Sequence, residues 1–404
     1  MYRNREHENM LLILYVLISI TGIGYFIVAA KSGTLSLWAY SDDIVSSGGS
    51  IPKIINYGKD IFLVLCTMKL FFQDNPIPLM RREWFYAISL VVVGTCMDMV
   101  NGNGVLCAIG GIRAYLYAFS VFIICKDQQF ESAFYRKLIR ISNLLLTSQL
   151  LAVLMQAGLT NGAAIGSGAY RMMGLFTNGG TLGSFAIGTA ILYSYAFIKY
   201  DFIGKFQYIF AFIVIAFLAL ASGGRGAVLF SICFLLIGLI TGLKEIGVKA
   251  RILLVPSILV CAMVAVIDKL TTYIGRGDIM VSGQGRIRAW QDLFEMNIID
   301  LLIGQGLGVG TNTARSMGYT SVTMDSTVTV LIVQFGIIGL LLVSILYFLF
   351  ATNMLQKKDT LLWYRIWIVV FVMVMLLSGS LFEQYVMIVP LIIVCADIII
   401  APQE

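Results

Sequence analysis

Long apolar segments follow one another along almost the whole chain, with short polar turns between them. Each is about as long as an α-helix must be to cross roughly 30 Å of hydrocarbon at about 1.5 Å per residue. The pattern predicts about twelve transmembrane helices, near residues 10–30, 53–72, 84–100, 105–125, 138–158, 178–198, 206–222, 226–242, 252–268, 327–350, 363–380 and 386–400. A β-barrel would instead show short segments that alternate in polarity. The expected fold is an all-α integral membrane protein, one polytopic helical bundle over residues 1–404.

One long polar stretch, Asp268 to Ser326, interrupts this pattern between two predicted helices. It contains several arginines, a tryptophan that we expect to be exposed, and a run of alternating glycines. Functional residues are often carried by loops that a rigid scaffold positions. We therefore expect the chemistry of the protein to lie in this loop.

Composition supports the membrane assignment and excludes other classes. The chain is 59% hydrophobic and 12% charged, whereas soluble domains carry about 25% charged residues. The first apolar run, Met10 to Ala30, is too long for a signal-peptide core and has no small-residue cleavage pattern after it, so it predicts a retained helix. The net charge of +6 comes from basic residues scattered among the loops and does not indicate nucleic-acid binding.

Cysteine and histidine usage narrows the possible chemistry. All seven cysteines fall in apolar runs without a Cys-x-x-Cys pair, which is typical of small buried side chains and not of disulfides or metal ligands. The single histidine, His7, lies in the charged N-terminal tail. A histidine-based catalytic or zinc site is therefore nearly excluded, and no metal site is predicted.

The distribution of lysine and arginine orients the bundle, because cytoplasmic loops carry an excess of both. We assign the side that collects most basic residues of the short loops to the cytoplasm. Both termini are then cytoplasmic. The outer face holds the loops near 31–52, 101–104, 159–177, 223–225, 268–326 and 381–385.

The predicted outer face still carries basic residues from residue 100 onward, and all but one are arginine: Arg113, Arg171, Arg225, Lys269, Arg276, Arg286, Arg288 and Arg315. Positive charge is disfavoured on this face, so its presence suggests a use. Arginine binds phosphate through two parallel hydrogen bonds and keeps its charge when partly desolvated. We interpret these residues as candidates for anion binding, and expect roughly half of them to snorkel or to pair with nearby acids instead.

Two of these arginines stand next to predicted helix starts. Arg225 lies in Ser222-Gly223-Gly224-Arg225-Gly226, where glycines permit a sharp turn and a close approach. Arg171 precedes Asn178, a polar neighbour that we expect to be free. Backbone N–H groups at a helix start favour a bound anion. The alternatives are a hairpin cap for Arg225 and an interfacial anchor for Arg171.

Arg286 and Arg288 differ in their expected roles. If a helix starts at Gly285, Arg286 and Trp290 share one face, whereas Arg288 lies over Asp292 at the same spacing. A salt bridge is therefore the obvious alternative for Arg288. Trp290 could offer an aromatic face to a sugar ring or a cation, although interfacial tryptophans are equally common.

The remaining polar features of the loop are its glycines and its last acid. Residues 304–310 alternate glycine with other residues but lack the lysine and following helix of a nucleotide site, so we interpret them as a flexible turn near the membrane surface. Asp325 precedes the apolar run from Thr327 and is the candidate general base, with a helix cap as the alternative. Asp60 and Asp98 are further acids within predicted spans, either functional or paired with arginines.

The order of these segments resembles the bacterial O-antigen polymerase and O-antigen ligase superfamily. Residues 170–178, Tyr-Arg-Met-Met-Gly-Leu-Phe-Thr-Asn, are similar to its Arg-x-x-Gly segment that ends in asparagine, and residues 222–227 to its Ser-Arg-Gly-Ala turn with glycine inserted. Gly285-Arg286, Trp290 and the glycines from Gly304 resemble its Gly-Arg-x-x-x-Trp loop. Asp325-Ser326, then nine intervening residues and Gly336-x-x-Gly339, fit the ligase pattern except at the first position, where ligases carry histidine. The resemblance covers about residues 105 to 350.

Because no other outer histidine replaces the missing one, the resemblance implies a polymerase of the kind called Wzy and not a ligase. Such enzymes are membrane glycosyltransferases of the GT-C type. They join undecaprenyl-diphosphate-linked oligosaccharides into O-antigen or capsular polysaccharide on the outer face of the bacterial cell membrane. The implied partners are this glycan, as donor and acceptor, and the bilayer; binding of a chain-length regulator is left open.

The resemblance implies roles for individual residues. Arg171, Arg225 and Arg286 would stabilise the departing diphosphate, and Arg286 and Asp325 are the expected catalytic residues. Substrate binding would involve Arg171, Arg225, Arg288, Arg113, Arg276, Trp290 and Asn178. No cofactor or metal is expected, because arginine carries the charge and the outer loops show no Asp-x-Asp pair. The alternatives are a flippase for the same lipid-linked glycan, which should show internal repeats and charges buried on both halves, and an O-antigen ligase.

Overall fold

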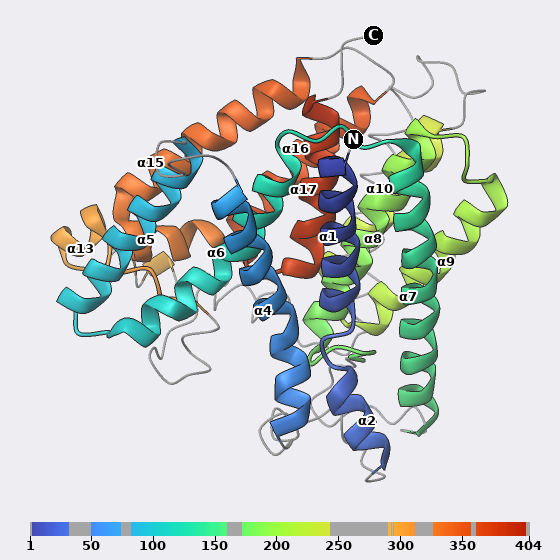
Figure 1. The fold of residues 1–404 in the computed structure, drawn as a ribbon, viewed down its shortest axis with the longest axis horizontal. Coiled ribbons are helices and arrows are strands. Elements are labelled where there is room, and N and C mark those ends of the chain that lie inside the picture. Colours follow the sequence, from blue (N-terminus) through green and yellow to red (C-terminus); the bar gives the residue numbers. More distant parts are fainter. Residues whose placement is uncertain are drawn as a thin grey trace.

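The structure is a computed structural model of the chain, and it describes residues 2–31, 50–73, 82–159, 172–242, 290–291, 293, 295–311, 326–356 and 361–400. Every element in this part of the chain is a helix (Figure 1). The helices are α1 (Tyr2–Ser19), α2 (Ile23–Lys31), α4 (Ser50–Gln73), α5 (Arg82–Val100), α6 (Val105–Cys125), α7 (Ser132–Leu159), α8 (Gly179–Lys199), α9 (Lys205–Ala221), α10 (Arg225–Gly242), α13 (Ile298–Ile303), α15 (Thr327–Leu355), α16 (Leu362–Ser378) and α17 (Tyr385–Ile400).

The protein has the architecture of a multi-pass helical membrane protein. Seven of the described stretches are helices long and apolar enough to cross a bilayer, and α9, α16 and α17 are shorter apolar helices. Every predicted span except 252–268 coincides with a described helix. That one span lies outside the described residues, so the total of twelve crossings stays a prediction, as does the GT-C type.

The two ends of the bundle carry different loops. α1 begins and α17 ends at the same end of the molecule (Figure 1), where Gln128 donates a hydrogen bond to His7 Nδ1 at 2.8 Å. We call this the terminal end. Both termini were predicted to be cytoplasmic. The side of the membrane that this end faces stays a prediction.

The opposite end gathers residues 20–22, 172–178, 222–224 and 379–384, and we call it the loop end. Gly22 N–H donates to the Leu175 carbonyl at 2.8 Å, and Met172 N–H donates to the Ala221 carbonyl at 2.8 Å. These bonds satisfy backbone groups that helix termini leave without internal partners. Segments far apart in sequence are thereby tied together at the loop end.

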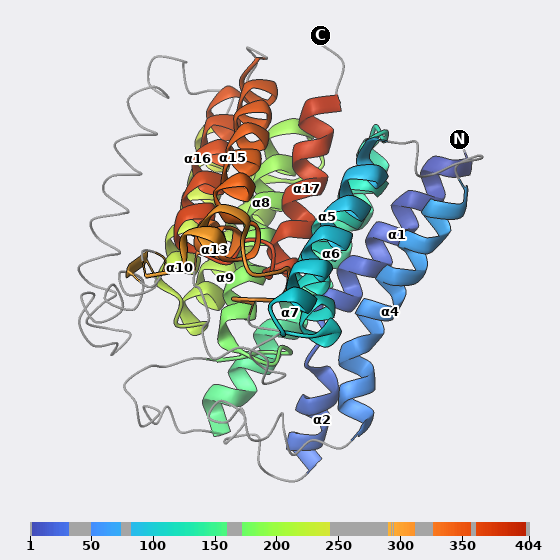
Figure 2. The same ribbon diagram turned by 90° about the vertical axis from the view of Figure 1, so that its left-hand side faces the viewer.

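The most buried of the candidate spans is α8, which packs against α9, α10 and α17. A Cβ added at Gly188 would lie 2.8 Å from the Val386 carbonyl oxygen of α17, so the two backbones approach closely there. Small residues permit such approaches in membrane bundles, where dispersion contacts drive helix association. At one edge of the bundle, α1 and α4 run side by side (Figure 2).

Helix α15 is broken within the bundle. Gly336 has φ 64° and ψ −163°, which interrupts the helix. The carbonyls of Val333 and Gln334, which a regular helix would use internally, instead accept hydrogen bonds from Gln305 N–H at 2.7 Å and Gly306 N–H at 3.3 Å. A Cβ at Gly336 would lie 2.2 Å from the Leu302 carbonyl oxygen. The polar segment that follows α13 therefore packs at the kink and bonds the carbonyls that the kink frees.

Candidate functional site

A group of charged side chains lies inside the apolar bundle between α4 and α6. The Asp60 carboxylate accepts from Arg113 Nη2 at 3.0 Å, from Lys59 Nζ at 3.2 Å and from the Tyr117 hydroxyl at 2.5 Å. We call Lys59, Asp60, Arg113 and Tyr117 the Asp60 cluster. Asp60 was predicted to be either functional or paired with an arginine, and the structure pairs it with Arg113.

The members of this cluster differ in their access to solvent. The side chain of Lys59 is 1% exposed and that of Asp60 16%, whereas Arg113 is 31% exposed. Burial of a charge costs free energy that only a partner of opposite charge offsets. Two cations share one carboxylate here, so the Asp60 cluster carries an excess positive charge. Arg113 is the charged member of the cluster with the most exposed side chain.

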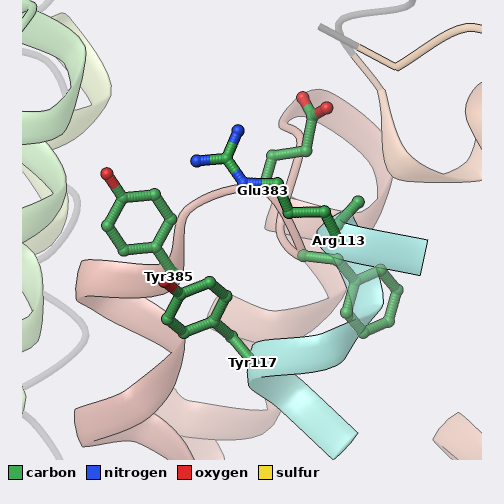
Figure 3. A pocket seen from close by; sticks show the side chains of 6 residues that line it. Arg113, Tyr117, Glu383 and Tyr385 are labelled. Carbon is green, nitrogen blue, oxygen red and sulfur yellow. The ribbon is translucent and has the colours of Figure 1, made fainter. Parts of the chain in front are cut away.

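A small cavity adjoins the cluster where α6 meets the start of α17. It has a volume of about 60 Å³ and is lined by Arg113, Ala114, Tyr117, Phe382, Glu383 and Tyr385; we call it the Arg113 cavity. Figure 3 shows the Arg113 guanidinium and the Glu383 carboxylate on one side of it and the two tyrosine rings on the other. It therefore offers donors and an acceptor next to an aromatic wall.

The aromatic wall is held in place by contacts on both tyrosines. The rings of Tyr117 and Tyr385 stack, with centroids 4.9 Å apart and an interplanar angle of 26°. The Lys59 ammonium lies 5.1 Å from the centroid of the Tyr385 ring, a cation–π contact. The same lysine thus connects the ion pair on α4 with the first residue of α17.

The Arg113 cavity is linked to the loop end through α8. Ser184 of α8 donates a hydrogen bond to Gln384, next to the cavity residue Glu383. A Cβ at Gly183 would lie 2.8 Å from Ala227 Cβ, so α8 also packs on the first turn of α10. Helix α10 starts at Arg225. Arg113 on α6 and Arg225 at the start of α10 are therefore connected through α17 and α8, and not through extensive packing of α6 on α10.

The turn before α10 is ordered by a serine. Ser222 Oγ accepts from Gly224 N–H at 3.2 Å and donates to the Ala219 carbonyl at 2.7 Å. Gly223 has φ 66°, a conformation that side chains rarely adopt. The inserted glycines of this segment thus form the tight connection that the sequence predicted. Arg225 is half-buried.

Asn178 has a defined structural role that differs from the prediction of a free polar neighbour. Its side-chain oxygen accepts from Thr181 N–H at 2.8 Å and from the Thr181 hydroxyl at 3.0 Å. Asn178 is therefore the N-cap of α8. The oxygen is engaged in this cap, and the residue is exposed at the loop end.

The glycine-rich segment 304–310 was predicted to be a flexible turn near the membrane surface; it does form a turn, and this turn is packed against neighbouring helices. The Asp98 carboxylate accepts from Gly308 N–H at 3.1 Å, and the Gln334 amide donates to the Leu307 carbonyl at 2.5 Å. A Cβ at Gly306 would lie 2.4 Å from Asp98 Oδ1. The glycines allow the segment to pack against α5 and α15, and Asp98, another predicted candidate, holds its backbone.

Two further residues near the predicted site are placed by the structure. Trp290, expected to be exposed, is partly buried and packs against the main hydrophobic core. Ser326 is the N-cap of α15 and donates to the Leu376 carbonyl at 3.2 Å. The helix-cap role considered for Asp325 thus belongs to its neighbour.

The other predicted site residues, Arg171, Arg276, Arg286, Arg288 and Asp325, lie outside the described residues. Sequence reasoning had also missed four residues of the cavity and cluster: Lys59, Tyr117, Glu383 and Tyr385. The charged pair Lys59-Asp60 within an apolar run is a signal that could have identified the first. Nothing local distinguishes the other three.

The fold and site define a multi-pass helical membrane protein with an ionic cluster and a polar cavity inside the bundle. The chain matches no protein-family model, and no curated protein is significantly similar to it. The resemblance to the polymerase superfamily therefore depends on the motifs in the sequence alone.

Proposed function

We propose that the protein is a membrane glycosyltransferase that polymerises undecaprenyl-diphosphate-linked oligosaccharide repeat units. The growing chain would leave its diphosphate carrier and be transferred to a hydroxyl at the non-reducing end of a new unit. The carbon–oxygen bond to the diphosphate breaks, a new glycosidic bond forms, and the acceptor hydroxyl loses its proton to a carboxylate. The reaction would take place on the outer face of a bacterial cell membrane.

One observation carries the proposal among the described residues: the Asp60 cluster with its adjoining cavity, inside an otherwise apolar bundle. Ionisable groups within membrane helices are costly and usually serve a purpose. Arg113 is pinned by Asp60 at 3.0 Å, so its position is fixed before any ligand arrives. A polar group that is fixed in advance orients a bound substrate without a further free-energy cost for ordering that group.

Arg225 and the start of α8, both at the loop end, add a separate argument for an anionic substrate. The first turn of a helix presents backbone N–H groups and a positive dipole end, and both favour an anion. Arg225 opens α10 directly after the glycine turn. A lipid-linked diphosphate at the membrane edge has the chemistry that this arrangement suits.

Elongation in a purified system tests the proposal. The protein in lipid nanodiscs is supplied with lipid-linked repeat units, and the products are separated by gel electrophoresis. We expect a ladder of longer chains, and the same ladder with a chelator present, because arginine and not a metal ion would carry the leaving-group charge. A preparation that binds the units but never lengthens them would refute the proposal.

A transporter of the same glycan is the second candidate, and one observation favours it. Charges are also buried at the terminal end, where Lys199 pairs with Asp397 at 2.9 Å and Arg365 is fully buried. Charges buried mid-membrane on both halves of the bundle were expected for a flippase. In cells that lack the protein, single repeat units on the carrier should accumulate outside for a polymerase and inside for a flippase. Long carrier-linked chains that never reach the final lipid would indicate a ligase.

A further inference from the structure

We infer that the Arg113 cavity is a subsite for the hydroxyl groups of a sugar ring and not for the diphosphate of the carrier. The inference rests on the proposed function, because it names the part of the lipid-linked glycan that this cavity would hold. It distinguishes Arg113 from Arg225, which stands at a helix start.

Among the described residues of the Arg113 cavity and the Asp60 cluster, the formal charges are balanced. Lys59 and Arg113 are cationic, and Asp60 and Glu383 are anionic, so the four formal charges cancel. A diphosphate carries several negative charges and is held by sites with a clear excess of positive charge. A carboxylate on the cavity wall would repel it. A neutral polar group meets no such repulsion.

The two polar groups that face the cavity complement a sugar hydroxyl. A guanidinium has five N–H donors, and the contact of Arg113 Nη2 with Asp60 uses only part of this set. An ionised carboxylate such as Glu383 only accepts hydrogen bonds. A hydroxyl does both. Arg113 and Glu383 both line the cavity (Figure 3), so its wall carries a donor and an acceptor.

The cavity is matched to one edge of a sugar ring. Its volume of about 60 Å³ corresponds to a few water molecules, since each needs roughly 10–15 Å³ measured in this way. This is too little for a polyprenyl chain or for a whole oligosaccharide. The Tyr385 ring is already stacked on Tyr117 and contacted by Lys59, so it forms a wall and does not offer a stacking platform.

Binding to two probes tests this assignment without depending on turnover. The first probe is the lipid-linked repeat unit extracted from cells that lack the protein, and the second is undecaprenyl diphosphate, which has no sugar. Equilibrium binding to the protein in nanodiscs is measured in the cold for wild type, Glu383→Gln and Arg113→Gln. Matched controls are Glu131→Gln and Arg140→Gln, which change exposed residues near the terminal end.

We expect Glu383→Gln to weaken binding of the glycosylated probe by roughly tenfold or more, from the usual strength of hydrogen bonds to charged groups. Binding of the sugar-free probe should be unchanged. Arg113→Gln should also weaken the glycosylated probe more than the sugar-free probe. The controls should leave both affinities at the wild-type level.

Two results would overturn the subsite while leaving the proposed function intact. If Glu383→Gln weakens neither probe although the wild type binds and elongates the repeat unit, the sugar lies elsewhere. If Arg113→Gln weakens both probes equally, the cavity serves the diphosphate. A wild-type protein that binds neither probe would instead remove the proposed function, and the subsite with it. Because Glu383 lies outside the helices, its amide variant is also expected to fold, which thermal unfolding of the purified protein checks.

Discussion

Replacing Asp60 with asparagine is expected to destabilise the bundle by about 3 kcal/mol, because it leaves the buried Lys59 and the partly exposed Arg113 without their shared carboxylate. Asp60 accepts from Arg113 at 3.0 Å and from Lys59 at 3.2 Å. The asparagine side chain has nearly the same shape and still accepts one hydrogen bond. The change therefore removes charge with little loss of packing.

The magnitude follows from distance and burial. At an effective dielectric constant of about 20, two unit charges roughly 3 Å apart attract by about 5 kcal/mol. Desolvation offsets much of this attraction, and removal of one partner of a buried pair costs about 3–5 kcal/mol. We take the lower end of that range because Arg113 is 31% exposed, so that water screens part of its charge.

Lys59 provides the matched comparison. Lys59→Met leaves the neutral pair of Asp60 and Arg113, and methionine fills much of the lysine volume. Its cost should stay within about 1 kcal/mol, since apolar replacement of a buried charge is often neutral. The double variant should be more stable than the sum of the single effects predicts, by about 1–3 kcal/mol, because the two residues are in direct contact.

The stability of all three variants is measured by unfolding the purified protein in mixed detergent micelles. Denaturing detergent is added stepwise, and the loss of helix is followed by circular dichroism. The reasoning requires that Asp60→Asn lose more stability than Lys59→Met. Equal losses, or a wild-type midpoint for Asp60→Asn, would show that the carboxylate does not compensate buried charge in this bundle.

Three further predictions address the loops and their chemistry. Gly306→Ala should lower the free energy of unfolding by about 2–5 kcal/mol, because Gly306 has φ 126° and a Cβ would lie 2.4 Å from Asp98 Oδ1. The control Gly102→Ala, with φ 76° and open space around it, should lose only about 1–2 kcal/mol through backbone strain. Equal unfolding midpoints for the two variants would contradict the clash at Gly306. Asn178→Ala should lose about 1 kcal/mol through the cap of α8, whereas Asn178→Ser should keep most of it, as measured by the same unfolding titration. Arg225→Gln should slow elongation of lipid-linked units by tenfold or more while leaving the unfolding midpoint near wild type; unchanged elongation would remove Arg225 from the reaction.

The glycine segment shows where local reasoning failed. Alternating glycines such as those at 304–310 are usually mobile in isolation, and nothing in the neighbouring residues indicates their partners. The partners are Asp98 on α5 and Gln334 on α15, both distant in sequence. Once those side chains satisfy the backbone, the freedom of glycine permits close packing instead of mobility. The kink at Gly336 completes this arrangement, since it frees the carbonyls that the segment uses.

Asn178 and Ser326 show the opposite case, in which a general preference was a better guide than a functional motif. Both belong to segments that resemble the polymerase superfamily, and both cap a helix in the structure. Small polar residues before an apolar run favour this role in any protein. Their positions in the motif therefore do not by themselves indicate contact with substrate.

The sequence by itself determined the helices and the membrane class. A run of apolar residues must be helical in hydrocarbon, because only internal hydrogen bonds can satisfy its backbone there. The distribution of lysine and arginine predicted that both termini are cytoplasmic, and this stays a prediction. These properties depend on neighbouring residues, so they can be read along the chain.

Only the tertiary structure decided which polar residues meet. Tyr117 reaches Asp60 across 57 residues, and Glu383 and Tyr385 join Arg113 from the start of the last helix. No periodicity encodes these pairings, because each depends on how the helices rotate and cross. Small residues such as Gly188 set those crossings through close backbone contacts. The charged pair Lys59-Asp60 was visible in the sequence, but its partners became known only from the packing of α4, α6 and α17.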